Sequence, residues 1–171
     1  MKRILCLFLS LSIIFIMFGC QNNDKGIAKT FYYPRNDFGY NKQEDKFYGS
    51  AIQAELRRDI PYQSIIQLLG EYLKGPLDPS LYNPFPTDLT LTDMTIQGEV
   101  LYVTVSDHLA NLRDIPLMLA CACLSKTAMS VTGTTTVCIR CAFSLLNGEN
   151  YIIMTADSLI FDDPVITEPK E

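Results

Sequence analysis

Between residues 27 and 60, the hydrophobic and polar positions predict two strands joined by a loop. Residues 27–33 are rich in β-branched and aromatic side chains, which favour a strand. Residues 50–60 alternate loosely between polar and apolar positions, so we expect a short second strand with one solvent-exposed face that includes Glu55 and Arg57. Residues 35–46 are mostly polar and are expected to form a loop.

The apolar residues between positions 65 and 73 recur at helical spacing and predict the first helix. Pro61 is expected in its first turn, where the missing N–H has no partner to lose. Gly75-Pro76 is expected to end the helix, because glycine tolerates positive φ and proline cannot continue the hydrogen-bond pattern. The proline-rich stretch 77–86 predicts an irregular crossing with no regular element.

The next stretch has the pattern of a β-hairpin. Residues 87–96 and 99–106 are both strand-like, and Gln97-Gly98 lies between them. Glycine supplies the positive φ that a tight hairpin turn requires. We therefore expect these two strands to pair in an antiparallel arrangement.

A second helix is predicted from Asp114 to about residue 130. Asp114 is the expected N-cap residue, and Pro116 suits the first helical turn. Lys126 is the only charged residue after that turn. The helix is therefore expected to be largely buried.

Residues 134–143 are the most strand-like stretch of the chain, because apolar residues alternate along them. The alternation places Cys138 on the exposed face. The positions expected to face the core are Val137, Ile139, Cys141 and Phe143. Asn147-Gly148 is a hairpin signal, and residues 151–154 are the expected return strand.

These elements predict a single small α+β domain. The elements from the first predicted helix onward follow one another in the core order αββαβ. We assign residues 27–156 to this domain. Residues 157–171 are acidic and contain proline, and they are expected to form a flexible tail.

The N-terminal segment has the charge order and length of an export signal. Lys2 and Arg3 precede an apolar run over residues 4–18, which is shorter than the roughly 20 apolar residues of a membrane-spanning helix. Cys20 follows this run. The polar residues after it suit a tether, which we assign to residues 20–26.

The four residues Met17-Phe18-Gly19-Cys20 resemble the lipobox of bacterial lipoproteins. The resemblance implies cleavage after a signal peptide of residues 1–19, and diacylation of Cys20 as the new N-terminus. Two acyl chains give stable anchoring, so membrane lipid at the extracytoplasmic face of the cell membrane is the expected partner of Cys20. Two alternatives are an ordinary thiol after a plain signal peptide and an uncut membrane anchor.

The charge of the chain bears on its partners. The net charge is −5, and loss of Lys2 and Arg3 with the signal segment makes the remainder more acidic. Nucleic acids and anionic headgroups both favour clusters of Lys and Arg. No basic run is longer than Arg57-Arg58, so we expect no nucleic-acid partner.

Four cysteines lie in the expected domain: Cys121, Cys123, Cys138 and Cys141. We expect them to be small buried thiols. One or two disulfides are an alternative, since an exported chain meets oxidants. A zinc site is a further alternative, although two cysteines at i and i+2 of a helix point about 200° apart and cannot easily bind one ion. We expect no cofactor.

Three stretches together resemble the GerM domain of sporulation and spore-germination lipoproteins. They are residues 68–76 with the following Leu81 and Pro86, residues 98–106, and the run from Lys126-Thr127-Ala128 into Val137-Cys138-Ile139. The resemblance implies a small α+β layer, a mainly antiparallel sheet of three to five strands with two helices packed on one face, related to the ring-building motifs of secretion systems. It also implies a non-enzymatic role in assembling an envelope protein complex during sporulation or germination.

No catalytic constellation is evident, and we identify no small-molecule substrate. His108 is the only histidine, and Ser106 with Asp107 is expected to form a turn or cap. The acids of the tail, Asp162, Asp163, Glu168 and Glu171, are expected to be solvated, with calcium binding as the alternative.

Two other functional classes stay open. One is a binding module that accepts a partner strand at an exposed sheet edge, formed by residues 27–33 or by the return strand at Tyr151. The other is a secreted hydrolase or a ligand carrier, which would need a pocket with convergent polar groups. His108 would be its only imidazole.

Overall fold

The computed structural model describes residues 28–37, 39–41, 46–48 and 51–159. The strands are β1 (Lys29–Pro34), β2 (Gly39–Asn41), β3 (Lys46–Tyr48), β4 (Ile52–Arg57), β5 (Leu91–Gln97), β6 (Val100–Val105), β7 (Thr136–Arg140) and β8 (Tyr151–Thr155). The α-helices are α2 (Ile65–Leu73) and α3 (Asp114–Thr132), and the short 3₁₀ helices are η1 (Asp107–Asn111) and η2 (Ala156–Ser158).

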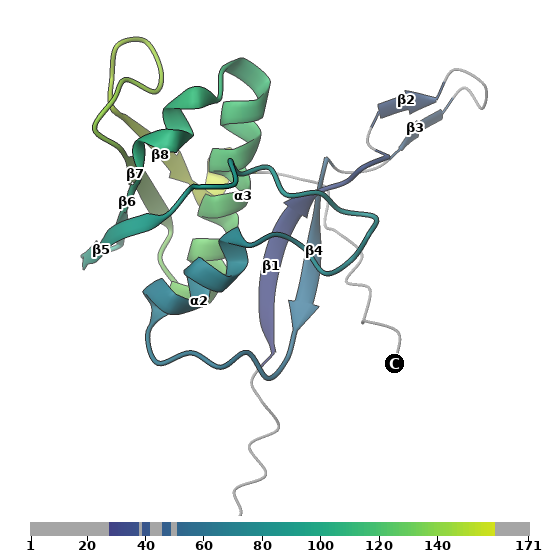
Figure 1. Cartoon of the computed structure of the whole chain (residues 1–171), viewed down its shortest axis with the longest axis horizontal. Coiled ribbons are helices and arrows are strands. Elements are labelled where there is room, and N and C mark those ends of the chain that lie inside the picture. Colours follow the sequence, from purple (N-terminus) through teal and green to yellow (C-terminus); the bar gives the residue numbers. More distant parts are fainter. Residues whose placement is uncertain (1–27, 38, 42–45, 49–50, 160–171) are drawn as a thin grey trace, which may run out of the picture.

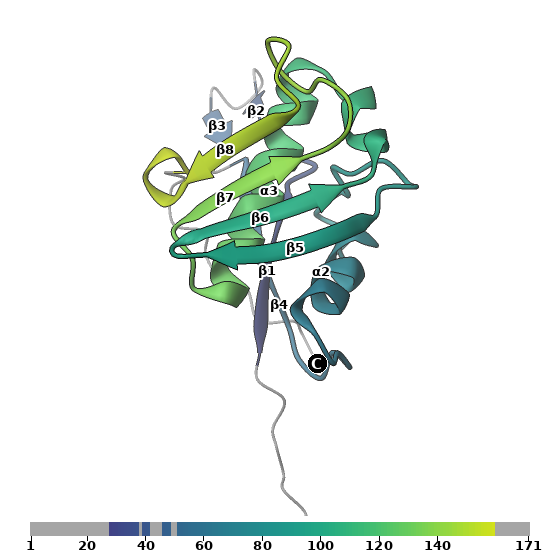
Figure 2. The same ribbon diagram turned by 90° about the vertical axis from the view of Figure 1, so that its left-hand side faces the viewer.

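The molecule is layered, as Figures 1 and 2 show from two sides. One layer is a four-stranded sheet in the order β5-β6-β7-β8, in which only β6 and β7 are parallel. Both α-helices cover the same face of this sheet, with α2 against β5 and α3 against β7 and β8. The predicted α+β fold with two helices on one face is confirmed.

The two N-terminal strands do not join this sheet. They form a separate antiparallel ribbon, β1–β4, in which Lys29 lies opposite Arg57. The ribbon packs against α3 on the side away from the four-stranded sheet, so α3 lies between two β layers. This position explains why α3 is buried around most of its circumference, as predicted.

Local residue chemistry explains several boundaries. Ser64 caps α2, and its Oγ accepts a hydrogen bond from the Gln67 N–H at 3.4 Å. Pro61 lies before this cap, so its predicted place in the first turn is wrong. Gly75 has φ +105°, and a Cβ there would lie 3.1 Å from Asn83, so the predicted glycine end of the helix is confirmed. Gly98 has φ +61° in the predicted hairpin turn.

The start of α3 differs from the prediction. Arg113 is the N-cap residue and makes no capping bond through its side chain, while Asp114 adopts φ +49° inside the first turn. The other end is regular, because Gly133 takes the left-handed conformation and its N–H bonds the Met129 carbonyl at 2.8 Å. By length and composition α3 could span a membrane, but half of it is buried, as in the core helix of a folded domain.

Four further expectations need correction. Part of the predicted loop 35–46 forms the short pair β2–β3. Cys138 is only 3% exposed, because its cross-strand neighbours Tyr102 and Ile153 shield its small side chain.

The other two corrections lie near the C-terminus. The strand predicted to reach Phe143 ends at Arg140, and Phe143 is 63% exposed in the connection to β8. The folded part continues past residue 156 into η2, and the side chain of Leu159 is buried.

Candidate functional site

The predicted lipid-anchor residue, Cys20, lies outside the described residues, as do the acidic residues 162–171. Its modification therefore stays a prediction. The functional features that the structure does describe are a buried ion pair at β4, two surface pockets, and the edges of the β layers.

A buried ion pair joins β4 to the segment that follows α2. The Arg57 Nη2 lies 2.5 Å from the Glu55 Oε2, and the two side chains are 10% and 9% exposed. The other oxygen, Glu55 Oε1, accepts hydrogen bonds from the N–H groups of Leu77 and Asp78, both at 2.7 Å. Arg57 also donates to the Gly75 carbonyl at 2.6 Å. We call Glu55 and Arg57 the clamp pair.

The clamp pair corrects the prediction that Glu55 and Arg57 lie on a solvent-exposed strand face. The segment from Gly75 to Asp78 folds over the end of β4 and covers that face. A charge buried in this way needs both an opposite charge and hydrogen bonds, and Glu55 has both. The signal in the sequence was an acid and an arginine two residues apart, which places both side chains on one face of a strand.

Two tyrosines extend this network into the core. The Tyr33 hydroxyl donates to the Tyr72 carbonyl at 2.6 Å and lies 3.2 Å from the Arg57 Nη2, which donates to it. The Tyr72 hydroxyl donates to the Tyr32 carbonyl at 2.8 Å. Burial raises the pKa of both Tyr33 and Tyr72 above the usual range. Both hydroxyls therefore stay protonated near neutral pH and serve as structural hydrogen-bond donors.

A groove of about 840 Å³ opens beside the clamp pair, between the end of β4 and the segment after α2. We call it the β4 groove. Apolar side chains of Leu56, Ile60 and Leu77 contribute to its lining, and Arg58 contributes a charge. The clamp pair also lines the groove, but its polar atoms are used within the protein. Such a lining can bind an amphipathic molecule and offers no activated nucleophile.

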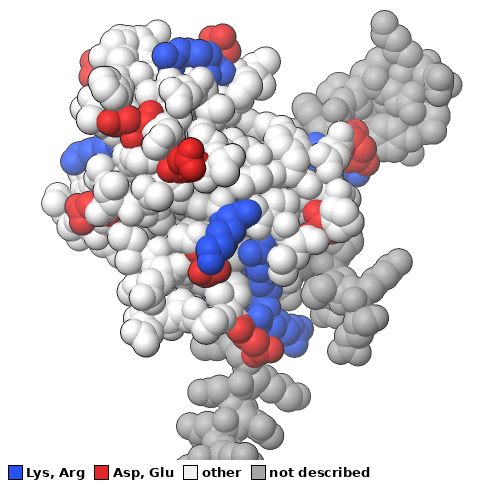
Figure 3. Space-filling model, viewed as in Figure 1, with Lys and Arg blue, Asp and Glu red and all other residues white. Residues whose placement is uncertain are grey.

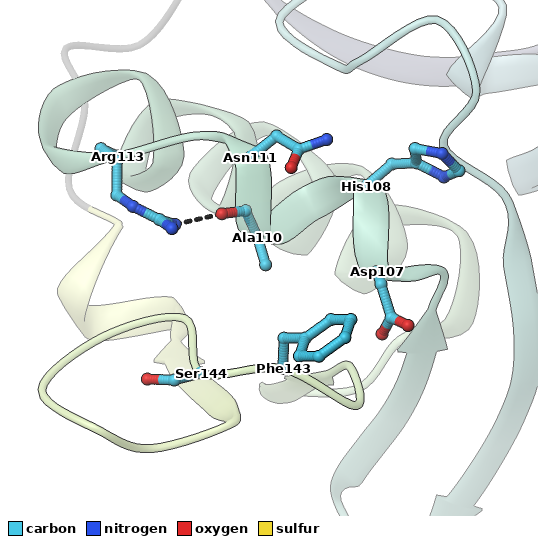
Figure 4. A pocket seen from close by; sticks show the side chains of 7 residues that line it. All are labelled: Asp107, His108, Ala110, Asn111, Arg113, Phe143 and Ser144. Atoms are coloured by element: carbon cyan, nitrogen blue, oxygen red, sulfur yellow. Dashed lines mark hydrogen bonds between the residues drawn. The ribbon is translucent and has the colours of Figure 1, made fainter.

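A second pocket, of about 540 Å³, surrounds the only histidine. The His108 Nδ1 lies 3.3 Å from the Ser106 Oγ, whereas the Asp107 carboxylate accepts a hydrogen bond from the Ala142 N–H at 2.9 Å. Figure 4 shows that the His108 ring and the Asp107 carboxylate point in different directions. Arg113, on the opposite wall, donates to the Ala110 carbonyl.

The polar groups of this pocket therefore hold the chain together. Asp107 ties η1 to the connection after β7, and Ser106 Oγ accepts from the Thr90 N–H at 3.1 Å. Ser106 lies at the N-cap position of η1 but makes no capping bond through its side chain. Both side chains instead bond backbone amides that are distant in the sequence, so the expected bonding to nearby amides is wrong. The orientation needed for a Ser-His-Asp triad, with the acid bonded to the histidine, is not present.

The two edges considered for strand binding differ. The outer edge of β1 is occupied by α3, because the Tyr32 N–H donates to the Thr127 Oγ1 and the Ser130 Oγ donates to the Thr30 carbonyl, both at 2.9 Å. Strand β8, in contrast, is the terminal strand of the four-stranded sheet. Among the described residues, the return strand is the one of the two candidates whose outer edge has no neighbouring strand or helix bonded to it.

The cysteines at positions 121, 123, 138 and 141 are all free and buried, as expected. Burial raises the pKa of Cys121 from the ordinary value of 9.0 to about 12, and it also raises the pKa of Cys123. The thiols of Cys121 and Cys123 are therefore unreactive near neutral pH. Across the described part of the chain, no group of three or more His, Cys, Asp or Glu residues is arranged to hold a metal ion.

Charged side chains are dispersed over the surface seen in Figure 3, where basic and acidic groups alternate on a mainly uncharged face. One ion pair, Arg35 with Asp37 just after β1, is partly exposed. A dispersed pattern of this kind differs from the contiguous basic surface that nucleic acids require.

No family model matches the sequence, and no curated protein matches it. Among solved structures, the chain is similar to the tandem GerMN domains of the sporulation protein GerM from Bacillus subtilis, with a TM-score of 0.54 and 12% sequence identity. The similarity covers 86% of this chain and 50% of that one, so the chain spans about half the length of the tandem-domain protein.

A weaker similarity links the chain to a lipoprotein candidate from Clostridium perfringens, with a TM-score of 0.43 and 15% identity over 81% of this chain and 93% of that one. At 12% identity, the likeness to the tandem GerMN domains establishes the fold. The chain has a GerM-like α+β fold, as the sequence resemblance predicted.

Proposed function

We propose that this protein is a lipoprotein, anchored through Cys20 at the extracytoplasmic face of the cell membrane, whose GerM-like domain has a non-enzymatic role in assembling an envelope complex during sporulation or germination. The observation that carries the proposal is the position of Gly19-Cys20 at the end of an apolar N-terminal segment, nine residues before a GerM-like domain begins at Lys29. A lipid at Cys20 would hold the domain close to the membrane surface.

The non-enzymatic role is supported by how the polar side chains are used. The clamp pair, Tyr33 and Tyr72 all bond within the protein, and Asp107 bonds a backbone amide instead of His108. An active site would need a nucleophile or base whose reactive atom faces a substrate. We expect His108→Ala to leave the cellular role intact, and a loss of that role with an unchanged fold would contradict the proposal.

The anchor is tested with a matched pair of cysteine variants. Cys20→Ser should release the protein from the membrane fraction, and Cys6→Ser, a change within the same N-terminal segment, should leave it there. Mass spectrometry of the N-terminal peptide should find a diacylated Cys20 in the parent and in Cys6→Ser. An unmodified N-terminus in the parent would overturn the lipoprotein assignment.

The assembly role is tested by co-purification. The full chain, extracted from membranes of sporulating and of growing cells of its source, should bring down envelope proteins only from the sporulating cells. Deletion of the gene should lower the yield of heat-resistant spores and leave vegetative growth unchanged. The same partners in both growth phases, or normal sporulation without the gene, would remove sporulation from the proposal.

The β4 groove favours a second candidate function, that of an envelope lipoprotein that binds a ligand. Its volume of about 840 Å³ lies within the usual range for small-molecule sites. Native mass spectrometry of the protein purified from its source tests this candidate. A bound small molecule that Leu56→Asp abolishes would support ligand binding, and an unliganded mass would argue against it.

A further inference from the structure

The free edge of β8 is short and has an unusual composition. In the ladder between β7 and β8, the Cys141 N–H bonds the Asn150 carbonyl and the Ala156 N–H bonds the Thr135 carbonyl. Because hydrogen-bonded pairs alternate in antiparallel ladders, the even-numbered residues of β8 bond to β7. The backbone groups of Tyr151, Ile153 and Thr155 therefore point away from the sheet.

One end of this edge is closed by the chain itself. The Ser158 Oγ accepts a hydrogen bond from the Thr155 N–H at 3.0 Å and donates to the Thr155 carbonyl at 2.8 Å. The outward groups of Tyr151 and Ile153 have no partner among the described residues. The open edge thus consists of two residues with four backbone hydrogen-bonding groups.

The side chains at this edge are also uncovered. Tyr151 is 40% exposed and Ile153 is 56% exposed, and both lie on the sheet face opposite to the helices. Soluble proteins commonly protect an edge strand with charged residues or proline, and residues 151–155 contain neither. This edge therefore lacks the usual barriers to strand pairing.

We propose that β8 pairs with β8 of a second copy of this chain, antiparallel and centred on Ile152. In that register Tyr151 of each copy lies opposite Ile153 of the other, and the four free groups on each side form four hydrogen bonds. The match is self-complementary, because the open edge is two residues long in both copies and each copy closes its own edge at Thr155.

The pairing also suits the side chains. It brings an aromatic and a β-branched residue together on one face twice, which is a favourable cross-strand combination. The two four-stranded sheets become one continuous sheet, with the helices of both copies on the same side. Glu149 lies opposite Thr155, so no like charges face each other across residues 149–155.

The interface is small, so we expect a weak dimer in solution that a shared membrane surface would strengthen. An extended segment of another protein could pair with the same edge, but it would need its own two-residue open edge and fitting side chains. A second copy of this chain already has both. The pairing of the two strands does not depend on an assembly role, and only its strengthening at a membrane rests on the proposed anchor at Cys20.

Cysteine cross-linking in membranes containing the full chain tests the register. In a Cys138→Ala background, which removes the thiol opposite Ile153 in the same sheet, Tyr151→Cys and Ile153→Cys chains of different size are co-expressed. The proposed register places these positions as a hydrogen-bonded pair with Cα atoms about 5.5 Å apart, within disulfide reach. We expect the mixed dimer, which joins a Tyr151→Cys chain to an Ile153→Cys chain, to exceed either same-site dimer several-fold.

Ile96→Cys is the matched control, because Ile96 is a similarly exposed isoleucine, 48% accessible, on the opposite edge strand β5. It should cross-link at background level. Same-site dimers as the main product, cross-links to a different protein, or no cross-link above the Ile96→Cys level would each overturn the proposal.

A second measurement needs no cross-link. The detergent-solubilised full chain should show a mass that rises with concentration in light scattering. Ile153→Lys should raise the dimer dissociation constant about 10-fold or more, because a charge opposite Tyr151 of the partner is unfavourable. Ile96→Lys should leave it unchanged. Equal effects of the two variants, with both folded, would contradict pairing through β8.

Discussion

Two ion pairs, one just after β1 and one in β4, have the same spacing in the sequence and different surroundings. Arg35 and Asp37 lie 2.6 Å apart with side chains that are 28% and 57% exposed. The clamp pair, Glu55 and Arg57, has almost the same separation, but the segment from Gly75 to Asp78 covers it. The N–O separations of the two pairs are nearly equal. Their different burial makes their contributions to the free energy of unfolding different.

The difference follows from solvation. Asp37 is more than half exposed and Arg35 is partly exposed, so water still reaches both side chains, and removing one partner leaves the other hydrated. Glu55 has exchanged water for one guanidinium and two backbone N–H groups. Removing Glu55 leaves the largely buried Arg57 without its counter-charge, although the Tyr33 hydroxyl and the Gly75 carbonyl still accept hydrogen bonds from it. It also removes the acceptor of the Leu77 and Asp78 N–H groups. The clamp pair therefore holds the segment after α2 on the ribbon, whereas the more exposed pair contributes little to the free energy of unfolding.

The largest expected effect separates these two pairs directly. Glu55→Ala should lower the free energy of unfolding by about 3–5 kcal/mol, the usual cost of breaking a buried pair. Asp37→Ala should cost at most about 1 kcal/mol. Urea unfolding at pH 7 measures both. Glu55→Gln keeps an oxygen for the Leu77 and Asp78 amides, so its loss in the free energy of unfolding should lie between the other two. Equal losses for Glu55→Ala and Asp37→Ala would show that burial does not distinguish the two pairs.

The next effect concerns the closed edge of β1. Thr127→Val removes the acceptor of the buried Tyr32 N–H and should cost about 1–3 kcal/mol. Thr127→Ser retains the hydroxyl and should cost less. Ser130→Ala removes an exposed bond to the same strand and should also cost less. Thermal unfolding of the three variants measures the order of their losses in stability. A loss for Ser130→Ala as large as that for Thr127→Val would contradict the claim that the buried Thr127 hydroxyl is the main bond closing the β1 edge.

Alkaline pH should weaken the buried core before it affects the exposed pair. Burial raises the folded-state pKa of Cys121 to about 12 from 9.0, and the pKa values of Tyr33 and Tyr72 are also raised. A raised folded pKa gives stability that is complete below the unfolded value and is lost as pH rises above it.

The free energy of unfolding should therefore fall from about pH 9 upward, by about 1.4 kcal/mol per ionising group for each pH unit. Urea unfolding at several pH values between 8 and 11 measures the slope. Cys121→Ala should reduce the slope above pH 9, and an identical slope in parent and variant would show that this thiol contributes nothing.

The smallest expected effect is a gain. The Ser125 hydroxyl is fully buried in α3 and has no hydrogen-bond partner in the described structure. Ser125→Ala removes this unsatisfied group and should raise the free energy of unfolding by about 1 kcal/mol. Chemical denaturation gives the sign. A loss of stability would indicate that the packing contacts of the Ser125 hydroxyl stabilise the fold by more than its missing hydrogen bond costs.

Local chemistry explains which elements could be predicted. Gly75, Gly98 and Asn147-Gly148 occupy positions with positive φ, and each marks the end of a helix or a hairpin turn. The α+β class followed from the order of these elements, and the two helices on one face followed from the resemblance to GerM domains. The same local reasoning misplaced the N-cap at Asp114, because the chain enters α3 from η1 with Arg113 in the extended conformation.

The candidate sites were harder to predict. Alternation along β7 correctly assigned Cys141 to the core, yet it placed Cys138 in solvent. Alternation reports which face a side chain takes and contains no information on what covers that face. Tyr102 and Ile153, from two other strands, provide the cover. The β4 groove depends in the same way on segments that are distant in the sequence.

The sequence by itself determined the helices, most of the strands, their turns and the resemblance to GerM domains, because these depend on residue spacing and on φ preferences within a few positions. Only the tertiary structure decided that β1 and β4 form their own ribbon and that Glu55 and Arg57 are buried. It also decided that α3 closes the edge of β1, while no other described strand pairs with the outer edge of β8. Each of those outcomes depends on which distant segment excludes water from a given surface, and local spacing cannot encode that.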